Sequence, residues 1–472
     1  MTQATAPAAA PARTRAPRRS PTELTFQLDE SHVEQLASTG PEWLATDRRA
    51  ALERYATVPI EPNQLYTTYL DLRLADLSGV RAYDVRASEK TADAVSARTD
   101  GLPDGLSGLA SFREDKIHSL VLDDDARAAG VTIETPEGLI ARDPETARRL
   151  IVDDAELPAN DRLAQLTRAA WDQGLVVRVP DGVRLERPIV LRWSAGRPER
   201  ALVTRTIIEL GDGAHATVLE EFVPSGPRIE CAEGEPVPQS LFTGTLEVHL
   251  GAGADLSIAS IQEFGPGVVA FQHRTASIGE GANLRWALGQ LGGRLVRSRV
   301  DNRLRGDRSS VEQVEIVFGG DDQLFDLTSY TWHLGRDTTG NLLSKGALLD
   351  RARSFMKGLI TIEKSAIGTD SFLGEFGMNL SKAARAVAIP SLEIDQPDCR
   401  RAAHSSSVGP IDEAQLFYLE SRGIPADEAR KFIVLGFLEP VVARVPVKEA
   451  QDRLRDLLEA KWAAGLGAPA AA

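Results

Sequence analysis

Three short phrases repeat the same glycine pattern in the middle of the chain. They are LGDGAHATVL from Leu210, LGAGADLSIA from Leu250 and IGEGANLRWA from Ile278. Each sets an apolar residue before Gly-x-Gly-Ala, and the alternation of apolar and polar residues that follows is typical of a β-strand. Glycine permits the positive φ of a tight turn, and a phrase that returns at unequal spacing indicates solenoid coils with loops of variable length.

The same pattern has a second interpretation, a β-sandwich in which unrelated hairpins each carry a glycine turn. The hairpin signal Asn-Gly is absent, whereas turn-and-strand phrases recur. We therefore predict a parallel β-helix over residues 175–408, which starts at LVVRVPDGVRLERPIVLRW and has its late strand phrase SLEID ending at 395. Stacked Val, Ile and Leu are expected to fill its interior.

Helical periodicity flanks this region on both sides. Residues 23–174 are predicted to form a mainly helical N-terminal domain. Residues 409–472 are predicted to form a second helical domain, because Asp412 and Gln415 have capping-box spacing and Gly423 is placed to end the first helix. The predicted fold class is therefore mainly β, a right-handed parallel β-helix between N-terminal and C-terminal α-helical domains.

Residues 1–22 differ from the rest in composition. Apart from Met1 and Gln3, the first 21 residues are Ala, Pro, Arg, Thr and Ser. We predict a disordered tail rather than an organellar transit peptide, because Pro is frequent and no amphipathic pattern is visible. No run of 18 apolar residues and no signal-peptide core occur, so we expect a cytoplasmic chain that does not enter membranes. A net charge of −14 argues against nucleic-acid binding.

The chain has two cysteines, Cys231 and Cys399. Two are too few for a disulfide framework or for a four-thiolate iron–sulfur site within one chain. A cluster bound here would need ligands from a partner.

Five phrases in order along most of the chain resemble the SufB/SufD family of the SUF iron–sulfur cluster assembly machinery. GPEWLATDRRAALERYATVP is similar to the family's N-terminal helix, and AAWDQGLVVRVPDGVRLERPI is similar to the phrase that opens its β-helix. In the C-terminal part of this chain, SKGALLDRARSFMKGLITIEKSAIGTDS and HSSSVGPIDEAQLFYLESRGI, with the later EAR and IVLGF, resemble characteristic phrases of the family.

This resemblance implies a scaffold subunit rather than an enzyme. It implies pairing with a SufB-like paralogue through the β-helix, binding of the ABC-type ATPase SufC through the C-terminal helices, and a homodimer as a further possibility when the chain is isolated. The chain has no GxxxxGK[ST] phosphate loop, so we expect no nucleotide site here and ATP hydrolysis in SufC.

Two departures favour the SufD-like branch. SufB-like members carry a sulfur-accepting cysteine in the phrase that is GMNLSKAARAVAIPSLEI here, and a glutamate after the histidine, where this chain has Ser405. Without a thiol that phrase cannot accept sulfane sulfur. SufD-like members carry a cysteine two positions before the histidine, and here that position is Ala402. A SufB-like, cluster-bearing scaffold is the alternative.

His404 is the candidate iron or cluster ligand at the partner interface, because a neutral imidazole nitrogen binds iron. Its structural alternative is a histidine that ends the solenoid and bonds a backbone carbonyl. A transient iron–sulfur cluster at the SufB interface is implied by the resemblance. Cys399 is a weaker candidate, since a buried cysteine commonly packs as a small apolar residue.

Five apolar residues of the C-terminal helices are predicted to dock the ATPase, and the alternative is that they pack these helices together. They are Leu416, Phe417, Tyr418, Ile433 and Phe437. Cys231 and the isolated histidines His215, His249, His273 and His333 receive no site role.

A remote alternative is a β-helix polysaccharide lyase or hydrolase. Its acid pair would be Asp321–Asp322 or Glu220–Glu221. Adjacent strand residues point to opposite faces, so neither pair is expected to form a dyad if it lies in a strand.

Overall fold

The computed structural model describes residues 19–85, 102–227 and 237–466. Most of the predicted tail, together with Cys231, therefore lies outside the described residues. The helical elements are α1 (Glu30–Ser38), α2 (Glu42–Thr57), η1 (Thr67–Tyr69), α3 (Asp124–Ala128), α4 (Pro136–Arg142), α5 (Pro144–Arg148), η3 (Arg149–Asp153), α6 (Arg162–Ala170), α7 (Glu413–Ser421), α8 (Ala426–Val442) and α9 (Lys448–Leu466).

The strands form two ten-stranded sheets in the described part of the chain. Sheet A contains β1 (Arg81–Ala82), β4 (Thr132–Glu134), β5 (Gln173–Val179), β7 (Arg200–Leu210), β9 (Ser240–Leu250), β11 (Val268–Ile278), β13 (Leu295–Leu304), β15 (Leu324–His333), β17 (Arg353–Ile362) and β19 (Arg385–Ile394). Sheet B contains β2 (Gly108–Arg113), β3 (Lys116–Leu122), β6 (Ile189–Ala195), β8 (His215–Pro224), β10 (Asp255–Gln262), β12 (Asn283–Gln290), β14 (Ser310–Gly319), β16 (Thr339–Leu348), β18 (Asp370–Asn379) and β20 (Arg401–Gly409).

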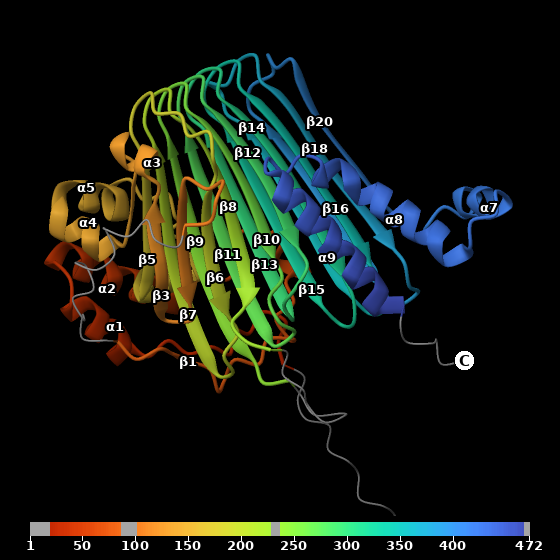
Figure 1. Ribbon diagram of the computed structural model, residues 1–472, viewed down its shortest axis with the longest axis horizontal. Coiled ribbons are helices and arrows are strands. Elements are labelled where there is room, and N and C mark those ends of the chain that lie inside the picture. Colours follow the sequence, from red (N-terminus) through yellow and green to blue (C-terminus); the bar gives the residue numbers. More distant parts are fainter. Residues whose placement is uncertain (1–18, 86–101, 228–236, 467–472) are drawn as a thin grey trace, which may run out of the picture.

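From β5 onward the chain alternates between the two sheets, and each strand pairs in parallel with the strand two places later. This topology is a parallel β-helix, and Figure 1 shows its coils stacked along one axis. The predicted mainly β fold with flanking helices is confirmed. The region before residue 175 also contributes strands, and its β2–β3 and β4–β5 pairs are antiparallel.

The recurring glycine phrase forms the turn that leads from sheet A to sheet B. Its second glycine has positive φ in each coil, 65° at Gly213, 66° at Gly253 and 64° at Gly281. Its first glycine touches the turn of the preceding coil, since a Cβ on Gly251 would lie 2.8 Å from the backbone nitrogen of Asp212. The second glycine therefore allows the positive φ of the turn, and the first allows neighbouring coils to stack closely.

The same turn continues in later coils that lack the phrase. Arg308 and Asp337 occupy the positive-φ position there, with φ of 60° and 55°. The first glycine is retained as Gly306 and Gly335, and each lies against the backbone of the preceding turn. These two coils keep the stacking glycine and not the glycine at positive φ, whereas the next coil has Ala366 at the first position and Gly368, with φ of 76°, at the second.

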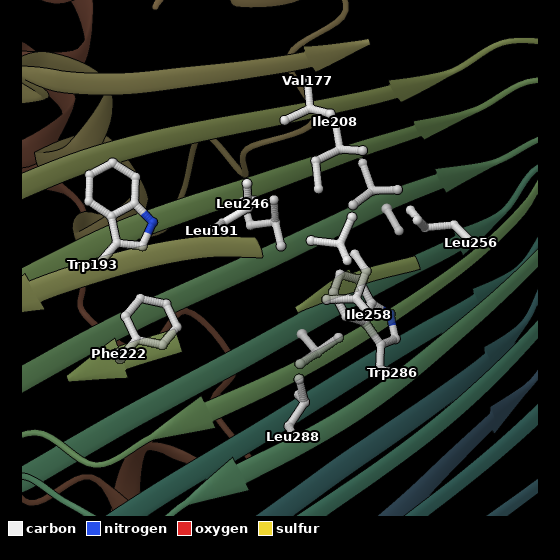
Figure 2. Close-up of a cluster of buried hydrophobic side chains, with 14 of the residues drawn as sticks. Val177, Leu191, Trp193, Ile208, Phe222, Leu246, Leu256, Ile258, Trp286 and Leu288 are labelled. Atoms are coloured by element: carbon white, nitrogen blue, oxygen red, sulfur yellow. The ribbon is translucent and has the colours of Figure 1, made fainter. Parts of the chain in front are cut away.

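The inner faces of the two sheets enclose the main apolar core. Figure 2 shows Val177, Ile208 and Leu246 of sheet A near Leu191 and Ile258 of sheet B. Burial of stacked aliphatic and aromatic side chains between the sheets is the main force that holds the coils together.

The segment at residues 59–77, here called the N-terminal strap, crosses the outer face of sheet A. Its apolar side chains pack on that face, and its Glu61 is buried in a charged network. Arg297 contacts Glu61 and Asp326 at 2.7 Å each, and Lys357 contacts Asp326 at 2.6 Å. Loss of one partner would leave a buried charge uncompensated, so this network fixes the position of the strap.

Helices α8 and α9 cover the outer face of sheet B through a second apolar cluster that includes Val434, Leu454 and Trp462. Lys345 of β16 donates a hydrogen bond from Nζ to the carbonyl oxygen of Phe437 at 2.8 Å. Helix α7 has no buried residue and projects away from the β-helix in Figure 1. In the part of the chain that the structure describes, no helix is both long and apolar enough to cross a membrane.

Candidate functional site

The β-helix ends in two strands that are paired on one side only. Within the described residues, β19 pairs with β17 and β20 pairs with β18, and no later coil covers either strand. We call β19 and β20 the open end. An edge of this kind presents backbone donors and acceptors to which another chain can add a strand.

The edge of β20 is uninterrupted. At the start of the strand, the amide of Arg401 donates to the carbonyl oxygen of Thr369 beside β18. Because the amides of a parallel strand alternate in direction, those of Ala402, His404, Ser406 and Val408 face the open side. None of these four residues is proline, so every donor is available.

The edge of β19 is blunted by comparison. The amides of Arg385 and Asp395 donate to Ala352 and Ile362 on the β17 side. By the same alternation, Pro390 lies at a position whose amide would face the open side, and proline has no N–H there. The open end therefore offers β20 as the better template for strand addition.

His404 lies on the face of β20 that continues the interior of the solenoid. It pairs in register with Leu373, whose side chain is 1% exposed in the core. His404 itself is exposed because no coil stacks on it. Val408 on the same face and Ile394 of β19 are also exposed, at 39% and 45%. The open end thus presents an imidazole beside apolar side chains.

Ala402 and Cys399, the two positions considered together with His404, lie at the start of β20 and just before it. Ala402 pairs with Ser371, on the same inward face as His404. Cys399 lies between β19 and β20, half-buried against an apolar cluster that includes Ile362 and Leu373. This packing is the environment expected of a small apolar residue.

Glu375 is a site residue that sequence reasoning missed. It pairs with Ser406 on the inward face, is 1% exposed, and accepts a hydrogen bond from the amide of Ile389 at 2.8 Å. Burial raises the pKa of this carboxyl to about 8, against smaller opposing effects of that hydrogen bond and of Lys357. A neutral acid therefore lies directly behind the exposed strand at pH 7.

The predicted docking residues divide into two groups. Phe417 and Tyr418 of α7 are 71% and 55% exposed, and Leu416 beside them is half-buried. Ile433 and Phe437 of α8 are also half-buried, and Phe437 packs against the cluster on sheet B. Phe432 of α8 is also exposed, at 58%.

The other candidates that the structure describes form no metal site, and Glu220 and Glu221 form no acid dyad. Among the described residues, no group of three or more His, Cys, Asp or Glu side chains has metal-binding geometry. Glu220 contacts Arg274 inside the β-helix, whereas Glu221 contacts Arg192 and Arg453 on the outer side. The predicted opposite orientation of this pair is therefore observed.

The family of the chain follows from comparison with known proteins. The family model described as "SUF system FeS cluster assembly, SufBD core domain" matches residues 193–437, from β6 into α8 and through the whole open end. The chain belongs to the SufBD family. Within it the chain is SufD-like, because its similarity to a SufD protein extends over nearly the full length of both chains.

Three relatives show how far the similarity of this SufBD chain extends. The iron–sulfur cluster assembly protein SufD of Bacillus subtilis is 26% identical over 442 residues, covering 93% of this chain and 97% of the relative. A SufBD family protein of Staphylococcus haemolyticus is 23% identical over 429 residues, 88% of each chain. One of Mycobacterium tuberculosis is 32% identical over 225 residues, 46% of this chain and 57% of the relative.

Proposed function

We propose that this chain is the SufD-like, non-ATPase subunit of an iron–sulfur assembly scaffold and that its open end pairs with a SufB-like paralogue. The observation that carries the proposal is the uncovered, proline-free edge of β20 beside exposed Val408 and Ile394. Strand addition there would pair the free amides and cover the apolar side chains together. The same edge would also allow two copies of the isolated chain to pair.

His404 would then lie at the junction of the two subunits. A neutral imidazole nitrogen is an iron ligand, but one imidazole holds neither iron nor a cluster tightly. Iron and sulfide are cargo in this proposal. The partner supplies the thiolates, because position 402 is alanine and Cys399 is packed against apolar residues.

The projecting end of the C-terminal domain would bind the ATPase SufC. Phe417 and Tyr418 of α7 and Phe432 in the first half of α8 are exposed aromatic side chains. Aromatic side chains of this kind are frequent anchors of protein interfaces. The second half of α8 is fixed to sheet B by Val434, Leu438 and the bond from Lys345 to Phe437, so movement of a bound ATPase would be passed to the β-helix.

Substitution of Ser406 by proline tests the pairing directly. The amide of Ser406 faces the open side, so Ser406→Pro removes a donor to the partner and no donor to β18. We expect Ser406→Pro to abolish co-purification with a co-expressed SufB-like paralogue, while Ser406→Ala retains it. Circular dichroism melting of both variants checks that the fold persists. A Ser406→Pro chain that pairs as tightly as the wild type would exclude β20 as the pairing edge.

A further inference from the structure

Gly244 interrupts the row of side chains on the inner face of sheet A and lines a small cavity there. Thr204, Gly244 and Gln272 lie side by side in register on β7, β9 and β11. Between them lies a small internal cavity, about 10 Å³ when measured as the space open to the centre of a water molecule. That space is of the size that holds a single water molecule.

The wall of this cavity contains a buried ion pair. Arg274, 1% exposed, donates from Nη2 to Glu220 Oε2 at 2.7 Å and to Ser260 Oγ at 2.9 Å. Glu220 is 4% exposed on the facing sheet. The charge of the guanidinium is therefore balanced inside the β-helix.

Four polar atoms beside the cavity have no protein partner among the described residues. They are Nε and Nη1 of Arg274 and Nε2 and Oε1 of Gln272. Both side chains are more than nine-tenths buried, and buried polar groups without a protein partner are commonly bonded to an internal water molecule.

We propose that an ordered water molecule occupies the cavity next to Gly244 and completes the hydrogen bonding of Gln272 and Arg274. Water accepts from the free N–H groups and donates to the amide oxygen of Gln272. An ion does not fit, because Glu220 already balances the charge of Arg274. An apolar ligand does not fit either, because it would leave all four atoms unpaired.

A crystal structure of the full chain, at a resolution that shows other buried waters, tests the proposal without any substitution. We expect one well-ordered water within hydrogen-bond distance of Gln272 and Arg274. An empty cavity, or density for an ion, would overturn it.

Two variants then test which residues hold the water. Gly244→Ala adds a methyl group to the cavity wall, where it meets Thr204 and the ring of Phe242, and we expect the water to be lost and Tm to fall further than in Gly346→Ala. Gly346 is an inward-facing control in β16, where a Cβ would meet only ordinary contacts, the nearest at 3.4 Å to Ser354 Oγ.

Gly244→Ala also crowds Thr204, whose Oγ1 lies 2.5 Å from the position of the new Cβ. Gln272→Leu separates the two effects, because it removes two hydrogen-bonding atoms of the cavity wall at nearly constant volume. We expect the structure of Gln272→Leu to lack the water. A water retained in that variant would overturn the assignment to Gln272, whether or not Gly244→Ala folds.

Discussion

At the scale of single residues, the burial of an inward-facing side chain depends on the position of its strand in the stack of coils. Leu373 and His404 are partners in register on the same face, yet the first is buried and the second is exposed. Two residues further along the same strands, Glu375 is buried and its partner in register, Ser406, is exposed. The difference arises because β18 is covered by β20, whereas no strand among the described residues covers β20. Whether an inward-facing side chain is buried therefore depends on whether another strand covers its own strand.

The raised pKa of Glu375 predicts a dependence of stability on pH. Its pKa is about 8 in the folded chain and ordinary, near 4.5, in the unfolded one. The folded state holds the proton more tightly than the unfolded state. The contribution of this carboxyl to the free energy of unfolding is therefore complete below pH 4.5 and is lost as pH rises toward 8. We expect the free energy of unfolding to fall by on the order of 1.4 kcal/mol per pH unit in that window from this group alone.

Glu375→Gln keeps an acceptor for the amide of Ile389 and cannot ionise. We expect urea unfolding of this variant to show a shallower loss of stability between pH 5 and 8, and a more stable protein than the wild type at pH 8. Equal slopes for the two proteins would show that Glu375 does not carry the dependence.

His404→Ala is expected to impair cluster formation without impairing pairing, because the backbone amide at position 404 is unchanged. The measurement is iron and sulfide content, with the visible absorbance of the reconstituted complex, against an equal amount of wild-type complex. His118→Ala is the control, an exposed histidine on β3 at the other end of sheet B. Cluster yields that are the same in all three complexes would remove His404 from the site.

At the scale of elements, sequence pattern predicted the turns where both glycines are present and missed those where only the stacking glycine remains. The phrases RGDRSS at 305–310 and LGRDTT at 334–339 retain that glycine, and this signal could have found the later turns. The N-terminal strap was not predicted because Glu61 meets Arg297 and Lys357 from distant parts of the chain. His404 was found through resemblance, whereas Glu375 needed the register of β18 against β20.

The exposed aromatic residues of α7 give a prediction about this element. We expect Phe417→Ala combined with Tyr418→Ala to reduce SufC binding at least tenfold, a loss of about 1.4 kcal/mol or more, because interface aromatics are frequent hot spots. Isothermal titration with purified SufC measures the effect. Leu65→Ala, which removes a 57% exposed apolar side chain from the N-terminal strap, should bind normally. Unchanged binding by the double variant would place the ATPase elsewhere.

At the scale of the whole molecule, the two ends of the β-helix are different. The first coils are covered by the β2–β3 hairpin, by β4 and by the N-terminal helices, whereas no described strand or helix pairs with the outer edge of the last coil (Figure 1). Periodicity predicts the solenoid but not which end is covered, because strands of either end have similar patterns. The covering depends on contacts between residues far apart in the chain.

The open end is also the part of the β-helix that leaves the ribosome last. Coils of a solenoid fold against their neighbours, and N-terminal elements fold first during synthesis. Every earlier strand therefore has a partner within its own chain by the time β20 emerges. The edge of β20 itself therefore becomes available for pairing only after every earlier coil of its own chain has been made.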